Sequence, residues 1–129
     1  MDIPHYMQTL GRNARSASRA MAAASTAAKN LALNRIADRL RRSETELIAA
    51  NALDLAARDA DSPMRDRLRL TAERIASIAA DMESVAGLPS PQGETIAEWT
   101  RPNGMTLRKV RVPFGVVGMI CEARPNVTA

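Results

Sequence analysis

The sequence is poor in aromatic, thiol and imidazole side chains. Its 129 residues contain one Phe, one Tyr, one Trp, one Cys and one His. A single cysteine excludes an intramolecular disulfide and a zinc site built on cysteine pairs. No apolar run approaches the roughly 18 residues that span a bilayer, and the first residues lack the basic and apolar segments of a secretory signal. We therefore expect a protein of the reducing cytoplasm with no membrane partner and no metal site.

Alanine and arginine are the abundant residues. The chain has 24 alanines, and 16 arginines against two lysines. Hydrophobic residues make up 46% and charged residues 25% of the chain, which is typical of a globular protein and excludes a disordered one. The formal net charge of +4 permits a polyanionic partner without requiring one, because 14 acidic residues are interspersed among the arginines.

The first two thirds of the chain have the apolar periodicity of helices. Each expected helix also has a recognisable start. The expected starts are Leu10 for a helix ending at Ala24, a cap at Ser25–Thr26, a capping box at Ser43–Glu46, the Ser62–Pro63 pair and a cap at Thr71. We expect Gly87 to end the last of these helices in the left-handed conformation.

From residue 94 the pattern changes to that of strands. Residues 94–112 predict a β-hairpin, with Asn103 and Gly104 in a type I′ turn whose two central residues both need positive φ. Residues 116–121 are apolar on both faces, which is typical of a strand buried in a parallel sheet. Such a strand needs parallel neighbours for its backbone amides, so we expect the N-terminal piece of a larger α/β protein.

Chemically useful side chains follow this expected strand. Ligands of open parallel sheets bind beyond the carboxyl ends of the strands, where Glu122, Arg124 and Asn126 supply an acid, a guanidinium and a carboxamide. Arginine at this point suits a phosphate or a carboxylate, although a turn followed by a helix cap explains the same residues. We expect Cys121 to be a packed, inert thiol, because the acidic Glu122 beside it disfavours the thiolate.

Arginines on helix faces permit an alternative interpretation. Arg35, Arg39 and Arg42 share one helical face and could contact a phosphate backbone. Solvated faces explain them better, because no aromatic residues are interleaved for base stacking and no nucleic-acid-binding motif is present. A non-catalytic interaction module is the other alternative, and a stable monomer with a cooperative melt would favour it.

We expect no salt-sensitive retention of the chain on immobilised DNA or RNA. Retention that weakens with salt, and that disappears when Arg35, Arg39 and Arg42 are neutralised together, would contradict this expectation and establish a nucleic-acid-binding module.

Five segments spread along the chain match one family of enzymes. They are STAAKN at 25–30, ANALD at 50–54, DRL at 66–68, WTRPNG at 99–104, and PFGVVGMI at 113–120 with EARPNVT at 122–128. Together they resemble the gamma-glutamyl phosphate reductases, also called glutamate-5-semialdehyde dehydrogenases. The EARPNVT run is highly specific to this family.

The resemblance implies membership of the aldehyde dehydrogenase superfamily and an α/β fold. The expected architecture is a helical layer, a β-hairpin and the first parallel strand of an incomplete Rossmann-type domain. Residues 1–93 would be the N-terminal helical part of the cofactor-binding domain. Residues 94–112 would be the hairpin of an oligomerisation element, and residues 113–129 the first strand and loop of the cofactor-binding domain. The complete enzyme is then expected to be a homo-oligomer.

The same resemblance implies NADPH-dependent reduction of L-glutamate 5-phosphate to L-glutamate 5-semialdehyde and phosphate, in proline biosynthesis. A cysteine thiolate forms a thioester with the substrate, and hydride from NADPH reduces it. That cysteine is expected downstream of Ala129, so no residue of this chain is assigned a catalytic role and the 129-residue chain is expected to be inactive. The residues expected to bind the cofactor are Ile120, Cys121, Glu122, Ala123 and Arg124, and those expected to bind the substrate or an oxyanion are Arg124 and Asn126.

Overall fold

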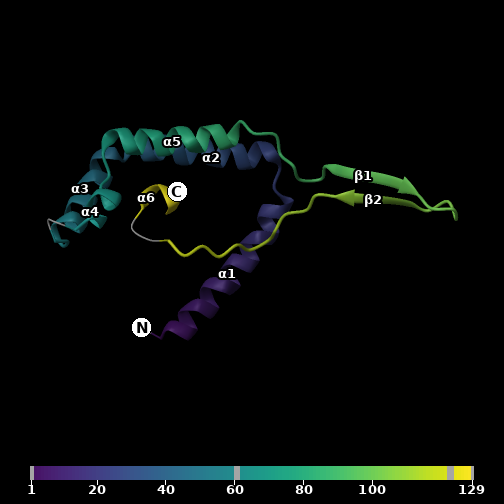
Figure 1. Ribbon diagram of the computed structural model, residues 1–129, viewed down its shortest axis with the longest axis horizontal. Helices are drawn as coiled ribbons and strands as arrows, with labels where there is room; N and C mark the ends of the chain where they lie inside the picture. Colours follow the sequence, from purple (N-terminus) through teal and green to yellow (C-terminus); the bar gives the residue numbers. More distant parts are fainter. Residues whose placement is uncertain (1, 60–61, 122–123, 129) are drawn as a thin grey trace. The chain divides into compact units, whose positions relative to one another are not determined.

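The computed structural model describes residues 2–59, 62–121 and 124–128 (Figure 1). Within these ranges the elements are α1 (Ile3–Ala23), α2 (Thr26–Arg42), α3 (Glu44–Ala56), α4 (Met64–Leu68), α5 (Ala72–Ala86), β1 (Thr95–Thr100), β2 (Thr106–Val110) and α6 (Pro125–Thr128). The chain divides into two compact units, one made of residues 1–26 and 89–118 and the other of residues 27–88 and 119–129. None of the helices in the described ranges has the length and apolarity needed to cross a membrane.

In the first unit, helix α1 begins earlier than its apolar pattern predicts. The Asp2 carboxylate accepts a hydrogen bond from the backbone N–H of His5 at 3.2 Å, which caps the helix. Pro4 lies in the first turn, where its missing N–H costs no intrahelical hydrogen bond. At the other end of α1, the Gln92 side chain donates a hydrogen bond to the carbonyl of Ala22 at 2.8 Å.

The predicted hairpin is confirmed, but its turn differs from the expected type. Gly104 has a φ of 84°, whereas no residue other than glycine has positive φ in the described ranges, so Asn103 is not in the left-handed region that a type I′ turn requires. The carbonyl of Arg101 accepts from the N–H of Gly104 at 2.9 Å, and the N–H of Arg101 donates to Met105 at 2.8 Å. Pro102 fixes a negative φ at the second turn position, which favours a type I turn and leaves the positive φ to Gly104.

Strands β1 and β2 pair antiparallel, and cross-strand ion pairs hold their register. Glu98 lies opposite Arg108 and forms an ion pair with it, and Glu94 pairs with Arg111 at 2.7 Å just beyond the strand ends. The register shifts between Thr95 and Ala97, so Ile96 is the extra residue of a β-bulge.

The expected first parallel strand at 116–121 is not formed by this chain on its own. Residues 111–121 form no regular element, and Phe114 and Ile120 are 100% and 99% exposed. The sheet of the described residues contains β1 and β2, which pair with each other. An apolar segment without a neighbouring strand has no partners for its backbone amides and therefore forms no ladder.

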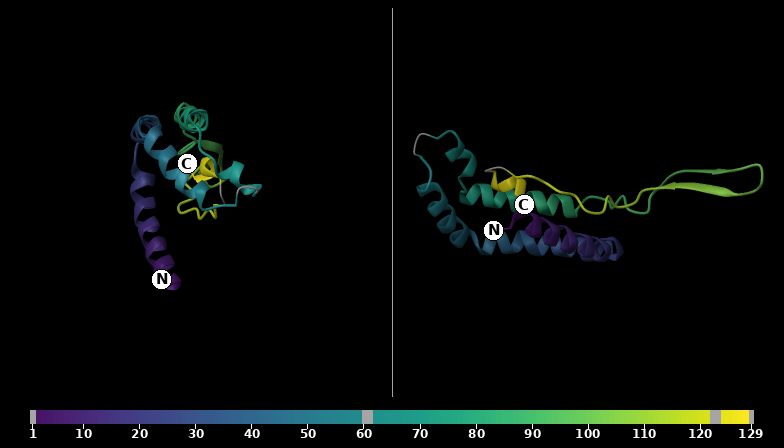
Figure 2. Two further views of the ribbon diagram at one scale, coloured as in Figure 1. Left: turned by 90° about the vertical axis from the view of Figure 1, so that its left-hand side faces the viewer. Right: turned by 90° about the horizontal axis from the view of Figure 1, so that it is seen from below.

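The second unit has its core between α2 and α5, which lie side by side (Figures 1 and 2). Ala37 of α2 and Ala79 of α5 are fully buried, and Ile75 and Ile78 add the larger buried side chains. Helix α5 therefore supplies most of the buried side chains of this small core.

Two helix ends lie at the predicted residues, but their conformation differs from the prediction. Ser43 precedes α3, but its hydroxyl makes no capping hydrogen bond, so the predicted capping box is wrong. Its φ and ψ of −95° and 12° lie outside the extended region that a cap residue adopts. Gly87 ends α5 in the right-handed conformation, with φ and ψ of −80° and −12°. The cap at Thr71 is confirmed, because its hydroxyl accepts from the N–H of Arg74 at 3.2 Å.

An exposed ion pair also joins α2 to α5. The guanidinium of Arg41 donates to both carboxylate oxygens of Glu83, at 2.5 and 2.8 Å. These hydrogen bonds lower the pKa of Glu83 and raise that of Arg41. Because both side chains are more than 40% exposed, the pair contributes little to stability in water.

We predict that Glu83→Gln reduces the stability of the chain slightly at pH 7 and not at pH 3. Since the folded-state pKa of Glu83 is lowered, its contribution is present above the unfolded pKa of about 4.3 and is lost as the pH falls through the folded pKa. Urea unfolding followed by circular dichroism at both pH values measures the difference from wild type. Glu46→Gln, at an exposed position of α3, is the control, and an unchanged Glu83→Gln effect at pH 3 would contradict the prediction.

Candidate functional site

The connection between α4 and α5 is held by one buried carboxamide. Asn51 of α3 is 5% exposed. Its Nδ2 donates to the carbonyl of Leu68 at 2.9 Å, and its Oδ1 accepts from the N–H of Leu70 at 2.8 Å. Both functions of the side chain are therefore satisfied by backbone groups two residues apart, which fixes the path of residues 68–70 across α3.

Arg74 fixes the same connection from the α5 side. Its Nη1 donates to the carbonyls of Asp66 and Arg69, at 2.5 and 2.7 Å. Its Nη2 lies 3.3 Å from a carboxylate oxygen of Asp66. The guanidinium thus joins the last turn of α4 to the first turn of α5.

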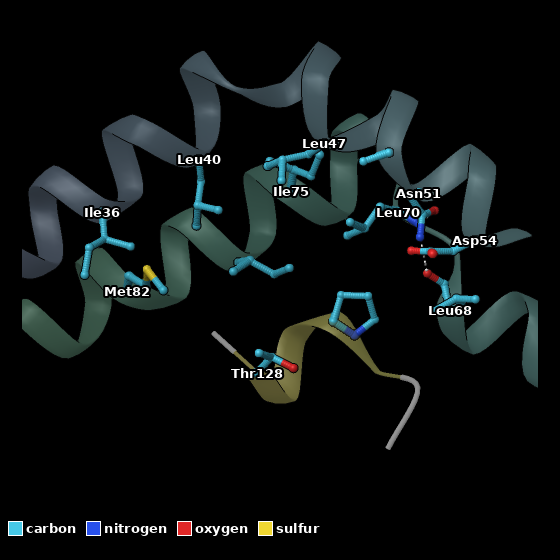
Figure 3. A pocket seen from close by; sticks show the side chains of 13 residues that line it. Ile36, Leu40, Leu47, Asn51, Asp54, Leu68, Leu70, Ile75, Met82 and Thr128 are labelled. Carbon is cyan, nitrogen blue, oxygen red and sulfur yellow. Dashed lines mark hydrogen bonds between the residues drawn. The ribbon is translucent and has the colours of Figure 1, made fainter. Parts of the chain in front are cut away.

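Residues of the α4–α5 connection line two cavities. Leu68 and Leu70 line a groove of about 640 Å³ that we call the apolar groove (Figure 3). Figure 3 shows Ile36 and Leu40 above the groove and Thr128 of α6 on its opposite side. Most of its lining is apolar: Ile36, Leu40, Leu47, Ala50, Asn51, Asp54, Leu68, Leu70, Ile75, Ile78, Met82, Pro125 and Thr128.

The second cavity has about 390 Å³ and is rich in arginine; we call it the arginine pocket. It is lined by Asp66, Arg67, Arg69, Leu70, Arg74, Ser77, Ile78, Asp81, Arg124, Pro125 and Asn126. Because guanidinium groups match the geometry of phosphate and carboxylate, this pocket is suited to a small anion.

Proteins that are similar in sequence and in structure carry the same name. No family model matches the chain. The gamma-glutamyl phosphate reductase of Gluconobacter oxydans is 49% identical over 127 residues, which is 97% of this chain and 30% of that protein. The enzyme of the same name from Koribacter versatilis is 52% identical over 115 residues, 89% of this chain and 28% of that protein.

A solved structure of an enzyme with this name has a similar fold. The crystal structure of gamma-glutamyl phosphate reductase from Thermotoga maritima superimposes with a TM-score of 0.85 at 38% identity, over 91% of this chain and 29% of that one. Over nearly its whole length the chain is similar to part of these gamma-glutamyl phosphate reductases. It spans about 30% of the length of the curated relatives it matches, and its helices and small antiparallel sheet match the N-terminal part of this reductase.

The structure brings together two of the residues that the resemblance to the reductases singled out. Arg124 and Asn126 both line the arginine pocket. Cys121 is exposed, so the expectation of a packed thiol is wrong, because the buried strand to which it was expected to belong is not formed. Ile120 is exposed as well, and Glu122 and Ala123 lie outside the described residues.

Sequence reasoning missed the other arginines of the pocket. Arg67 belongs to the DRL segment at 66–68, but neither it nor Arg69 or Arg74 was predicted to meet Arg124. The available signal was the Arg-Leu-Arg-Leu sequence at 67–70, in which both arginines line the arginine pocket, Leu68 lines the apolar groove and Leu70 lines both.

We predict that Asn51→Ala lowers the free energy of unfolding by about 1–3 kcal/mol, because it leaves a carbonyl and an N–H of the α4–α5 connection without partners. Urea unfolding followed by circular dichroism provides the measurement. Asn34→Ala, on the exposed face of α2, is the matched control and should change stability by less than about 0.5 kcal/mol. Equal effects of the two substitutions would contradict the role given to Asn51.

Proposed function

We propose that this chain is the N-terminal part of an enzyme that reduces L-glutamate 5-phosphate to L-glutamate 5-semialdehyde and phosphate, with NADPH, in proline biosynthesis. The observation that carries this proposal is the combined likeness in sequence and fold, at 49% identity over 97% of the chain and a TM-score of 0.85. Identity of this level, spread over helices, hairpin and the EARPNVT run, supports a shared reaction as well as a shared fold.

The proposed reaction needs a nucleophile, an anion site and a hydride donor. A cysteine beyond Ala129 would displace phosphate from the acyl phosphate and form the thioester. NADPH would supply the hydride that reduces it. Ile120 and Cys121 are exposed here, so these residues do not enclose a nucleotide by themselves. What this chain contributes to substrate binding is the arginine pocket, in which Arg124 and Asn126 are candidates for substrate or oxyanion contact.

The proposal extends to the organisation of the enzyme. Residues 1–93 and 113–129 would belong to a Rossmann-type cofactor-binding domain, and residues 94–112 to an element that joins subunits of a homo-oligomer in the cytoplasm. Residues 116–121 would become a strand only beside parallel neighbours. Their apolar character on both faces and their exposure here support this role.

A segment exchange tests the proposed function. We predict that the Gluconobacter oxydans reductase retains NADPH-dependent reduction of glutamyl phosphate, within about tenfold, when its matching segment is replaced by this chain. The parent enzyme is the positive control, and the parent without the segment is the negative control. The 129-residue chain assayed alone should show no turnover. A chimera that lacks activity, folded or not, would contradict the proposal.

A further inference from the structure

We propose that the arginine pocket binds the phosphoryl group of a small molecule through Arg67, Arg69 and Arg124. The phosphate chemistry is inferred from the side chains of this chain. Only the identity of the molecule, an acyl phosphate or the phosphorylated ribose of a dinucleotide, rests on the proposed function.

Three guanidiniums of the pocket have no carboxylate partner among the described residues and can bind an anion. Four arginines and two aspartates line it. Arg74 is paired with Asp66, at 3.3 Å. Of the described carboxylates, none forms an ion pair with Arg67, Arg69 or Arg124, and Asp81 is the remaining acidic residue of the lining. The pocket therefore has an excess of positive charge that an anion would balance.

Two of these arginines extend from a backbone that is already fixed. Asn51 binds the backbone of Leu68 and Leu70, the neighbours of Arg69 in sequence. Arg74 holds the carbonyl of Arg69 at 2.7 Å. Arg67 and Arg69 both line the arginine pocket, together with Leu70. Because the backbone that carries Arg69 is already held, an anion can bind there without a change in the path of the chain.

The size and the remaining lining define the class of ligand. A cavity of about 390 Å³ lies at the small end of the range for small-molecule sites. The hydroxyl of Ser77 and the carboxamide of Asn126 can add neutral hydrogen bonds to phosphoryl oxygens. Its described lining includes no aromatic side chain, so the pocket lacks a stacking surface for the bases of a nucleic acid.

We predict that inorganic phosphate binds the 129-residue chain and shifts the side-chain Nε–H signals of Arg67, Arg69 and Arg124 in NMR titrations at constant ionic strength. Arg69→Ala and Arg124→Ala should each weaken binding about tenfold, because each removes charge-assisted hydrogen bonds. Arg35→Ala is the matched control, since Arg35 lies in a separate arginine group on α2 with Asp38, Arg39 and Arg42, and it should leave binding unchanged.

Two competitors distinguish the sources of the phosphoryl group. Methyl phosphate matching inorganic phosphate in affinity would assign the pocket to an acyl phosphate, whereas adenosine 2′,5′-bisphosphate binding at least about tenfold tighter would assign it to the cofactor. The proposal is overturned if phosphate gives no shifts beyond those of chloride, or if Arg35→Ala weakens binding as much as Arg69→Ala. Because these titrations involve no turnover, their failure is separate from failure of the reductase activity.

Discussion

The two hydrogen bonds of Asn51 are the constraint on which the described site depends. A buried carboxamide must have both its donor and its acceptor satisfied, and here the backbone of Leu68 and Leu70 does this. These two residues, held against α3, line the apolar groove, and Leu70, Arg67 and Arg69 line the arginine pocket. One polar group thereby fixes the segment of chain that the two cavities share.

Arg74 stabilises the α4–α5 connection, whereas Arg67 and Arg69 do not take part in these contacts with their side chains. Its guanidinium donates to the backbone carbonyls of Asp66 and Arg69 as well as approaching the Asp66 carboxylate. Arg67 of α4 and Arg69 just after it have no ion pair among the described residues. One arginine of the pocket therefore supports the backbone, while two others line the pocket without a carboxylate partner.

Local sequence signals predicted elements well and their ends less well. The Thr71 cap and the hairpin were correct, because a cap hydroxyl and an Asn-Gly pair act over a few residues. The capping box at Ser43 failed because the single residue between α2 and α3 does not have the extended conformation of a cap. The type I′ turn failed because Pro102 favours a different turn. Both errors arise where one local preference competes with an adjacent one.

The sequence by itself determined the helices, the hairpin and, through its five matching segments, the likeness to gamma-glutamyl phosphate reductases. These depend on short-range periodicity and on residue identity, which are present in the chain whatever its tertiary contacts. Only the tertiary structure decided that residues 116–121 stay unpaired and that Arg124 meets Arg67 and Arg69. A strand needs a neighbour and a pocket needs walls from distant segments, and these long-range contacts are not encoded in any local pattern.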